Sequence, residues 1–493
     1  MKRSNFSRRD FLKAAAFASF LSTVGGHSLL ALSAPSRKLI STQEWLSDNI
    51  FLQGINAPVF QEVDVDHLKI TGEIPPDLNG MYMRNGPNPY LKPANYQYPL
   101  EGDGMIHAVY LKEGKASYRN RWILTKTLQQ DMEGKERQNM PLVNFANTNI
   151  VPYGDHLLAL YEVGLPYKIS GELETLGEWD FDGELEEAMT AHPKVDPITG
   201  ELHFYRYSLL AAPYLVYYVA DKQGKIIRKT PIEMESPALI HDTAITENYI
   251  IFFHCPLVFN VFQALGGGLP FEWKPEYGTK IGLIHRKNID QKPIWIETEP
   301  LWMWHFMNAY EQEGEVVVDF AYHNQLKLDP ATVNYGQEIK SHLQRLIINP
   351  EQKTAKHEPL DDRVVDFPTF DSRKTGQPYR FGYTPHIDVE LIAKNKIPNY
   401  FSELIQYDLE RKVSHVHRFK PGRYCGEASF IPKQGQEGED QGYVVTFVFD
   451  ENTATSSLVI LDPANFASEP VAEIHLPVRV PSGFHGNWIS SVI

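Results

Sequence analysis

Cysteine is scarce in this chain, because only Cys255 and Cys425 occur among 493 residues. Two cysteines in a chain of this length do not make a disulfide framework, and nothing in the sequence places them close together. An excess of positive charge is also lacking, since the formal net charge is −15. This acidic balance argues against a nucleic-acid partner and favours a small neutral or apolar substrate.

Three sequence signatures are missing as well. Beyond the N-terminal segment, no stretch reaches the roughly 18 uncharged apolar residues that a membrane-spanning helix needs. No Gly-x-Gly-x-x-Gly fingerprint follows a strand-like run, so nothing points to a dinucleotide cofactor. No internal repeat is evident, and periodicity alone therefore does not identify a repeat architecture.

Residues 1–34 have the features of a twin-arginine export signal. Arg8 and Arg9 lie in Ser-Arg-Arg-Asp-Phe-Leu-Lys, and the moderately apolar stretch 14–32 that follows contains no Asp, Glu, Lys or Arg. Small residues offer a cleavage site at Ala31, Ser33 and Ala34. A basic tail without structure is the alternative, but the residues flanking the arginine pair favour export of a folded protein to the periplasm or another extracytoplasmic location.

The remaining chain is expected to form one large domain. We assign 35–60 to an N-terminal extension and 61–493 to a single domain, because β-rich closed architectures often run long as one unit. A hydrophobic content of 42%, with 26 Phe and 25 Tyr, is enough for a sizeable core.

Short apolar or alternating runs separated by turn residues predict an all-β fold. Such runs occur at 105–111, 156–161, 201–207, 214–220, 249–254, 315–321, 442–449 and 457–461. Few long helical periodicities lie between them. The turn sequences at 196–200 and 221–224 separate paired runs, as in the hairpins of propeller blades.

Four histidines are the strongest functional signal. His192, His241, His305 and His485 are spread over nearly three hundred residues, each in a distinctive local sequence. Neutral imidazole is a common ligand for borderline divalent metals, and four of them form an uncharged cage that leaves an iron(II) ion open positions for dioxygen. Ligands this far apart cannot share one helix or loop. The fold must therefore be a radial one that brings distant strands to a single axis.

Several ordered motifs show that the chain resembles the carotenoid cleavage oxygenase family from about residue 40 onward. They are Gly-Glu-Ile-Pro-Pro-Asp-Leu-Asn-Gly (72–80), Arg-Asn-Gly-Pro-Asn-Pro (84–89), Glu-Gly-Asp-Gly-Met-Ile-His (101–107) and Asn-Thr-Asn-Ile (147–150). The resemblance implies a seven-bladed β-propeller with a helical and loop dome over the active-site face. It also implies one Fe(2+) per chain on the four histidines, and a dioxygenase that cleaves a carbon–carbon double bond of a conjugated substrate into two carbonyl products.

The same resemblance assigns carboxylates that would hold the second nitrogen of three ligand histidines. Glu162 is expected to contact His241, and Glu427 is expected to contact His485. The third position departs from the family pattern, because Asp366 stands where glutamate is usual. Its side chain is one methylene shorter, so a contact with His305 requires the backbone to move in or a water to bridge.

Two further assignments concern the surroundings of the metal. Thr148 matches the residue whose methyl group crowds an open coordination position in the family; an ordinary strand threonine is the alternative. Seven histidines whose local sequences match no motif of the family are interpreted as structural or solvated: His107, His156, His254, His323, His386, His415 and His417.

Access to the metal is expected through the apolar segment 256–273. Its candidate access residues are Phe259, Phe262, Leu265 and Phe271. An apolar, glycine-rich loop of this kind suits contact with a membrane surface that holds a dissolved substrate. A buried crossover segment is an equally good interpretation.

Substrate class is indicated by one position. Stilbene-cleaving members of the family carry a lysine directly before the first carboxylate, and Tyr161 stands there in this chain. Loss of the cation favours an apocarotenoid or carotenoid. A stilbene-cleaving enzyme is the alternative within the family, and a propeller that binds carotenoid without converting it is the alternative outside catalysis. An isomerase or hydrolase on the same iron scaffold is the third.

Overall fold

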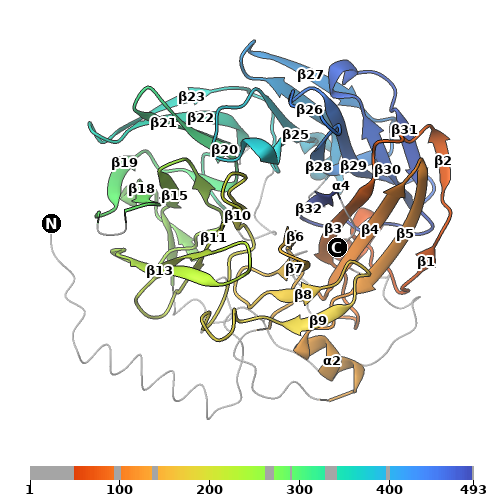
Figure 1. Cartoon of the computed structure of the whole chain (residues 1–493), viewed down its shortest axis with the longest axis horizontal. Coiled ribbons are helices and arrows are strands. Elements are labelled where there is room, and N and C mark those ends of the chain that lie inside the picture. Colours follow the sequence, from red (N-terminus) through yellow and green to blue (C-terminus); the bar gives the residue numbers. More distant parts are fainter. Residues whose placement is uncertain are drawn as a thin grey trace.

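Seven β-sheets arranged around a common axis account for most of the molecule (Figure 1). The computed structural model describes residues 49–93, 102–135, 143–260, 271–288, 291–327, 341–395 and 400–490. Each of the seven sheets has four or five strands, with neighbouring strands in the order of a propeller blade. The all-β, seven-bladed prediction is confirmed.

Five blades are built from strands close together in the chain. The first contains β6 (Asn149–Tyr153), β7 (His156–Leu160), β8 (Tyr167–Ile169) and β9 (Thr175–Glu178). The second contains β10 (Lys194–Val195), β11 (Leu202–Tyr207), β12 (Leu215–Ala220) and β13 (Ile226–Ile232). The third contains β14 (Ala244–Ile245), β15 (Tyr249–His254), β18 (Thr279–His285) and β19 (Ile294–Thr298). The fourth contains β20 (Trp302–Gln312), β21 (Glu315–His323), β22 (Ser341–Asn349) and β23 (Thr354–Pro359). The fifth contains β24 (Thr369–Phe370), β25 (Phe381–Ile387), β26 (Phe401–Asp408) and β27 (Val413–Arg418).

The two remaining blades combine strands from early and late in the chain, and so close the ring. One has the order β1 (Asp64–Val65), β5 (Lys115–Trp122), β4 (Gly104–Lys112), β3 (Gly80–Pro87) and β32 (Gly486–Ile489). The other has the order β2 (Lys69–Gly72), β31 (Ala472–His475), β30 (Thr455–Leu461), β29 (Gly442–Asp450) and β28 (Arg423–Pro432).

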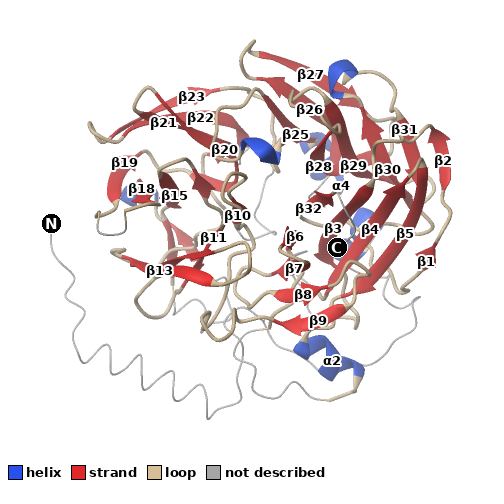
Figure 2. Cartoon of the chain, viewed as in Figure 1, coloured by secondary structure: helices blue, strands red, loops and turns tan. Residues whose placement is uncertain are grey.

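Helix is a minor component of the described residues (Figure 2). The helices are α2 (Lys126–Met132), α4 (Val389–Asn395) and the 3-10 turns η1 (Ile50–Leu52), η2 (Gly54–Asn56), η3 (Pro275–Tyr277), η4 (Ser372–Lys374) and η5 (Pro463–Asn465). The helical part of the expected dome is therefore small in this part of the chain. None of these helices has the length and apolar character needed to cross a bilayer.

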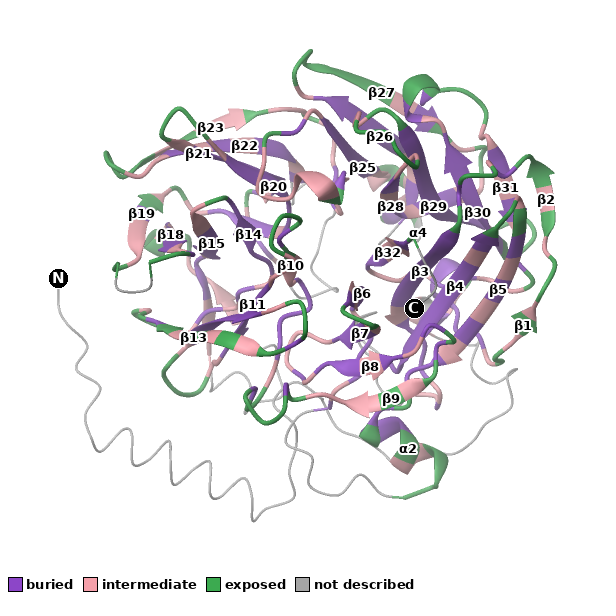
Figure 3. Ribbon diagram, viewed as in Figure 1, coloured by how far each residue is buried: buried purple, intermediate pink, exposed green. Residues whose placement is uncertain are grey.

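Burial along a blade follows the position of each strand (Figure 3). All six residues of β12, Leu-Val-Tyr-Tyr-Val-Ala, are buried, because neighbouring blades cover both faces of a strand in the middle of its sheet. The outermost strand, β13, alternates between half-buried and exposed residues along most of its length. The continuous apolar runs in the sequence thus mark inner strands.

The hydrophobic core is divided among the interfaces between blades. Between the two closing blades, Tyr82 and Val109 of one sheet pack in one cluster with Val445 and Leu458 of the other. Comparable clusters join the first blade to the second and the third to the fourth. The apolar side chains thus fill the interfaces between blades.

The strand runs read from the sequence agree with the observed strands. The runs at 105–111, 249–254 and 442–449, for example, correspond to β4, β15 and β29. Part of the predicted extension is also ordered, since Ile55 packs against Tyr400 and Tyr424. The expected export signal and residues 35–48 lie outside the described residues.

Candidate metal centre

The innermost strand of every blade carries or follows one of the candidate residues. These strands form one edge of their sheets, and most contact the next innermost strand around the ring. The candidates are Thr148 before β6, His192 before β10, His241 before β14, His305 in β20, Asp366 before β24, Glu427 in β28 and His485 before β32. Glu162 differs, because it follows β7. The radial fold therefore brings together residues that are far apart in sequence.

Two of these residues lie in β-bulges. The pairing of β20 with β21 shifts register between Met303 and Phe306, and His305 lies in this bulge. The pairing of β28 with β29 shifts between Cys425 and Ala428, and Glu427 lies in that bulge. A bulge adds one residue to a strand and changes the direction of the side chains there. Both side chains can thus point toward the axis from strands whose other residues belong to the blade.

The four histidines form a compact cluster. The ring of His192 lies 4.5 Å from that of His241, 5.3 Å from that of His305 and 4.6 Å from that of His485, measured between centroids. The His305 and His485 rings are 4.8 Å apart. One nitrogen from each of His192, His241 and His305 lies within 4.8 Å of the other two. These three histidines form a site that could hold a metal ion, with His485 beside them.

The chemistry of His192 fits a metal ligand. Its Nε2 atom is buried and has no hydrogen-bond partner among the described residues. An unsatisfied buried nitrogen is costly unless something else binds it. Burial, followed by the nearby histidines, holds the pKa of His192 well below its usual value. The imidazole is therefore neutral and has a lone pair free for a cation, as a ligand must.

Each of the other three histidines is held at its Nδ1 atom by a carboxylate. The distance is 3.3 Å from His241 to Glu162, 2.8 Å from His305 to Asp366 and 2.9 Å from His485 to Glu427. Such a contact fixes the tautomer and orientation of the ring, and leaves Nε2 for a metal. The shorter side chain of Asp366 reaches His305 directly, so no bridging water is needed at this position.

The carboxylates also set the electrostatics of the cluster. Burial lowers the pKa of His241, but the charge and hydrogen bond of Glu162 outweigh it, and the net pKa is raised. For His305 burial prevails over Asp366, and the pKa is lowered. Burial would raise the pKa of Asp366, but His305 and His323 more than offset this and keep it far below the usual range. Asp366 is therefore a buried anion beside the cluster.

Asp242 is a site residue that the sequence analysis missed. This carboxylate is 1% exposed. Its Oδ1 atom forms an ion pair with Lys194 at 2.8 Å, and its Oδ2 atom accepts a hydrogen bond from the backbone N–H of Phe306 at 2.9 Å. Lys194 follows His192, Asp242 follows His241 and Phe306 follows His305, so one side chain connects three histidine-bearing segments. Its place directly after a candidate ligand was the available signal.

His323 is the second missed residue: its burial fits the reading as structural and excludes the reading as solvated, but its contact with Asp366 was not foreseen. It is 5% exposed, and its Nε2 atom lies 3.3 Å from Oδ2 of Asp366. Nothing in the sequence around His323 indicates this contact. The only hint was the aspartate at 366, because a shortened side chain leaves room for another group.

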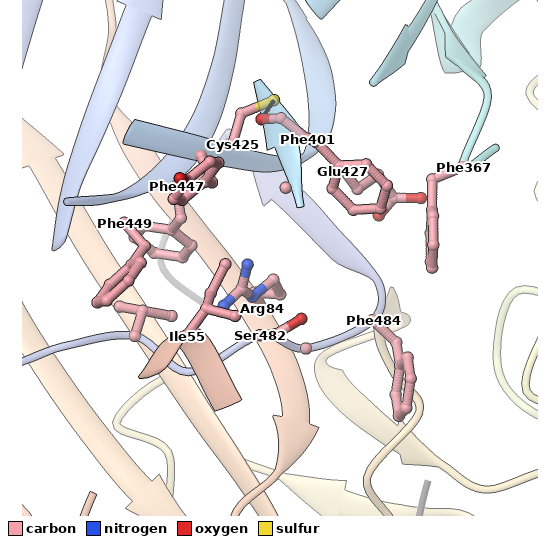
Figure 4. Close-up of a pocket in the computed structure, with 14 residues that line it drawn as sticks. Ile55, Arg84, Phe367, Phe401, Cys425, Glu427, Phe447, Phe449, Ser482 and Phe484 are labelled. Atoms are coloured by element: carbon pink, nitrogen blue, oxygen red, sulfur yellow. Dashed lines mark hydrogen bonds between the residues drawn. The ribbon is translucent and has the colours of Figure 1, made fainter. Parts of the chain in front are cut away.

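Aromatic rings surround the cluster. Phe367 stacks on His305 with centroids 4.7 Å apart, and Trp304 meets His241 edge-on at 4.7 Å. Figure 4 shows a pocket lined in part by Glu427, with Glu427 and Phe367 on one side and Phe447 and Phe449 on the other. The pocket has an empty volume of about 360 Å³, counting its open mouth. Phe367 belongs both to the lining of this pocket and to the ring stack on His305.

Thr148 lies beside His485 in the backbone. Its carbonyl oxygen accepts a hydrogen bond from the His485 N–H at 3.2 Å, and its own N–H donates to Leu160 at 3.0 Å. The side-chain hydroxyl donates to Asn147 at 3.2 Å. The methyl-crowding role assigned to Thr148 stays a prediction.

The expected access segment is partly described. β16 (Leu257–Phe259) pairs with β17 (Phe271–Trp273) in a two-stranded sheet inserted between β15 and β18. Leu257 is buried in the core of the third and fourth blades, whereas Phe259 and Phe271 are half-buried and face each other at 5.9 Å. Phe262 and Leu265 lie outside the described residues. One end of the segment is thus core, and its role in access stays a prediction.

Comparison with known proteins places these features in a family. The model of the retinal pigment epithelial membrane protein family matches residues 56–490. The carotenoid cleavage oxygenase of Mycobacterium tuberculosis is 31% identical over 90% of this chain and 98% of its own length. Carotenoid 9,10(9',10')-cleavage dioxygenase 1 of Pisum sativum is 33% identical over 90% of each chain. The crystal structure of Pseudomonas brassicacearum lignostilbene dioxygenase superposes with a TM-score of 0.84 at 28% identity, covering 93% of this chain and all of that one.

Proposed function

Since this chain belongs to the carotenoid cleavage oxygenase family, we propose that it is an iron(II)-dependent dioxygenase that cleaves one carbon–carbon double bond of a conjugated apolar substrate. The observation that carries the proposal is the buried histidine cluster on the propeller axis, with a carboxylate on three of its four rings. The reaction consumes one dioxygen for each double bond and gives two carbonyl products.

His192, His241, His305 and His485 would hold the iron, one ion per chain. When bound, iron(II) in an uncharged imidazole cage supplies open positions at which dioxygen is activated for attack on an electron-rich double bond. The protein's residues prepare this chemistry. Glu162, Asp366 and Glu427 retain the Nδ1 protons and so keep each Nε2 lone pair directed at the axis. Trp304 and Phe367 pack on the rings and restrict their rotation.

The substrate proposed is an apocarotenoid or a carotenoid. Tyr161 supports this choice, because a tyrosine in contact with Phe145, with ring centroids 5.8 Å apart, gives an aromatic wall without a cation. The relatives named for carotenoid cleavage support it too. A stilbene is the second candidate, supported by the likeness to lignostilbene dioxygenase.

An incubation with a substrate panel tests the proposal. Iron-loaded protein is given apocarotenals, carotenes and hydroxystilbenes under ¹⁸O₂, and products are identified by mass spectrometry. We expect paired carbonyl products that carry ¹⁸O, formed from an apocarotenoid or carotenoid, and no product with His241→Ala. Cleavage confined to hydroxystilbenes would contradict the carotenoid proposal and make a stilbene the substrate. Conversion without ¹⁸O would indicate an isomerase or hydrolase, and binding without conversion would indicate a carrier.

Location and membrane contact complete the proposal. The arginine pair at 8 and 9 supports twin-arginine export, with iron loaded before the folded protein leaves the cytoplasm. The apolar segment 256–273 supports contact with a membrane surface that holds the substrate. Changing Arg8 and Arg9 to lysine should leave active protein in the cytoplasm, as cell fractionation would measure. Export of that variant at the normal level would contradict the signal.

The membrane contact is tested with charged substitutions. Phe259→Asp together with Phe262→Asp should lower activity on vesicle-dissolved substrate far more than activity on detergent-solubilised substrate, because charge opposes insertion into an apolar interface. Leu210→Asp is the matched control, since Leu210 is an exposed apolar residue in another blade. Equal losses in both assays would mean that the segment is core or tunnel wall.

A further inference from the structure

The carboxylate of Asp366 has contacts on both of its oxygens. Oδ1 accepts hydrogen bonds from His305 Nδ1 at 2.8 Å and from the Phe367 N–H at 2.8 Å. Oδ2 lies 3.3 Å from Nε2 of His323. In Glu427, by comparison, Oε1 contacts His485 and Oε2 accepts from the Gly486 N–H at 2.8 Å. An imidazole from another strand therefore does for Asp366 what a backbone N–H does for Glu427.

The direction of this contact follows from the neighbouring serine. His323 ends β21 and stands opposite Ser341, which begins β22. The Ser341 hydroxyl donates its single proton to the Val365 carbonyl. It can only accept from His323 Nε2, which lies 3.3 Å away. Because both neighbours of Nε2 are acceptors, Nε2 carries the proton and donates it.

The positions of His323 and Asp366 in the fold explain how their contact affects the histidine cluster. His305 lies in β20 and His323 in β21, which belong to the same blade, whereas Asp366 precedes β24 of the next blade. A carboxylate held on one oxygen can rotate about its last side-chain bond. Contact on the second oxygen prevents this rotation and fixes the Nδ1 acceptor that orients His305.

We propose that His323 is a positioning residue of the metal centre, which holds the short Asp366 side chain in place and through it orients His305. The inference rests on the metal centre of the proposed function. In this proposal His323 contacts neither the four histidines of the cluster nor the substrate. It acts through Asp366 alone.

Cobalt(II) binding to the metal-depleted full-length protein is the direct test. His323→Phe retains a ring but removes the donor, so the affinity for Co(II) should fall by up to about 10-fold, the lower end of the range found when a direct partner of a metal ligand is lost. The visible d–d absorption of the bound cobalt should change as His305 tilts. His323→Gln places an amide N–H near the former Nε2 and should restore most of the affinity and the spectrum.

His107→Phe is the matched control. His107 is also buried, at 3% exposure, and its Nδ1 contacts the Tyr118 hydroxyl at 2.7 Å rather than a carboxylate of the cluster. This variant is expected to lose thermal stability but to bind Co(II) with the wild-type affinity and spectrum. A loss of affinity as large as that of His323→Phe would mean that any buried histidine has the same effect, and would overturn the inference.

A double variant tests whether His323 acts on the metal through Asp366. In Asp366→Ala protein, His323→Phe should cause no further loss of Co(II) affinity, because the side chain through which His323 acts is gone. An additive loss, or a wild-type affinity and spectrum in His323→Phe alone, would overturn the inference while the metal centre stands. Failure of the wild-type protein to bind Co(II) at all would instead overturn the metal centre itself.

Discussion

At the scale of single residues, the cluster combines neutral histidines with a buried anion. Burial keeps His192 and His305 neutral, while Asp366 stays ionised beside them. The charge of a divalent cation would be balanced by the surrounding carboxylates without direct contact. A site built in this way depends on each histidine for binding and on each carboxylate for orientation.

Loss of a histidine should therefore remove the metal. His192→Ala should lower the affinity for iron far more than substitution of a supporting carboxylate does, because the variant loses a proposed ligand and its lone pair. Metal analysis of purified protein should give about one iron per chain for the wild type and almost none for the variant. His67→Ala, at an exposed position, is the control. Normal iron content in His192→Ala would contradict the assignment of this residue.

Asp242 should support the site through the segments that it connects. Asp242→Asn keeps the shape of the side chain but removes the charge that faces Lys194, which should cost about 1–3 kcal/mol of unfolding free energy. Iron content should fall as well, since three histidine-bearing segments lose a common contact. Urea unfolding and metal analysis measure both effects.

The control for Asp242 is Asp155→Asn. Asp155 has an 86% exposed side chain and pairs with His156 at the surface, so its substitution should change the unfolding free energy by less than about 0.5 kcal/mol. Similar costs at the two positions would show that the buried ion pair has no special importance.

Individual residues also show what sequence could and could not reveal. The histidines and the carboxylates at 162 and 427 lie in short motifs, so a resemblance found them. His323 and Asp242 contribute through contacts between segments 43 or more residues apart, from 323 to 366 and from 242 to 306. Such contacts depend on how blades pack around the axis. The place of Asp242 after a histidine and the aspartate at 366 were hints, but neither identifies the partner of the contact.

At the scale of elements, the two bulges decide where the side chains point. The bulge in β28 is fastened by Thr446 of the neighbouring strand, which is fully buried. Its hydroxyl lies 3.1 Å from the Gly426 carbonyl and 3.0 Å from the Glu427 carbonyl, and it accepts from the Gly426 N–H at 3.3 Å. The strand itself was evident from its apolar sequence, but the added residue was not, because a bulge changes the register and not the composition.

Thr446→Val should release this bulge. The two side chains have nearly the same shape, so the effect reports the lost hydroxyl, and the unsatisfied backbone groups should cost about 1–3 kcal/mol of unfolding free energy. Iron retention should fall because Glu427 no longer holds His485 firmly. Thermal unfolding and metal analysis give the two readouts. Thr446→Ser retains the hydroxyl and should retain iron; a Val variant that matches the Ser variant in iron content would contradict this role of the bulge.

At the scale of the whole molecule, neutral histidines outside the cluster, one buried and one half-buried, make the fold sensitive to acid. Burial, followed by Arg286, lowers the pKa of His203 to about 3. Burial, followed by Lys280, lowers that of His254 to about 4. The unfolded chain binds these protons near pH 6.5, whereas the folded protein does not. Stability is therefore lost as the pH falls below 6.5, until the folded pKa is reached.

His203 provides a measurable share of this sensitivity. Each pH unit below 6.5 should cost about 1.4 kcal/mol at this residue, or about 2 kcal/mol by pH 5. His203→Gln cannot titrate, so urea unfolding of the metal-depleted protein at pH 7 and pH 5 should show a smaller decrease for the variant. Parallel decreases in the two proteins would mean that other groups account for the acid sensitivity.

The pairing of β31 and β32 with β2 and β3 has a consequence for synthesis on the ribosome. His485 directly precedes β32, and 293 residues separate it from His192. At the usual rate of translation this interval lasts roughly 15 to 60 s. The early histidines thus leave the ribosome long before their fourth partner, and the complete cage exists only when the last strands join the first. Any selectivity among metal ions that depends on all four histidines is therefore a property of the finished ring and not of the nascent chain.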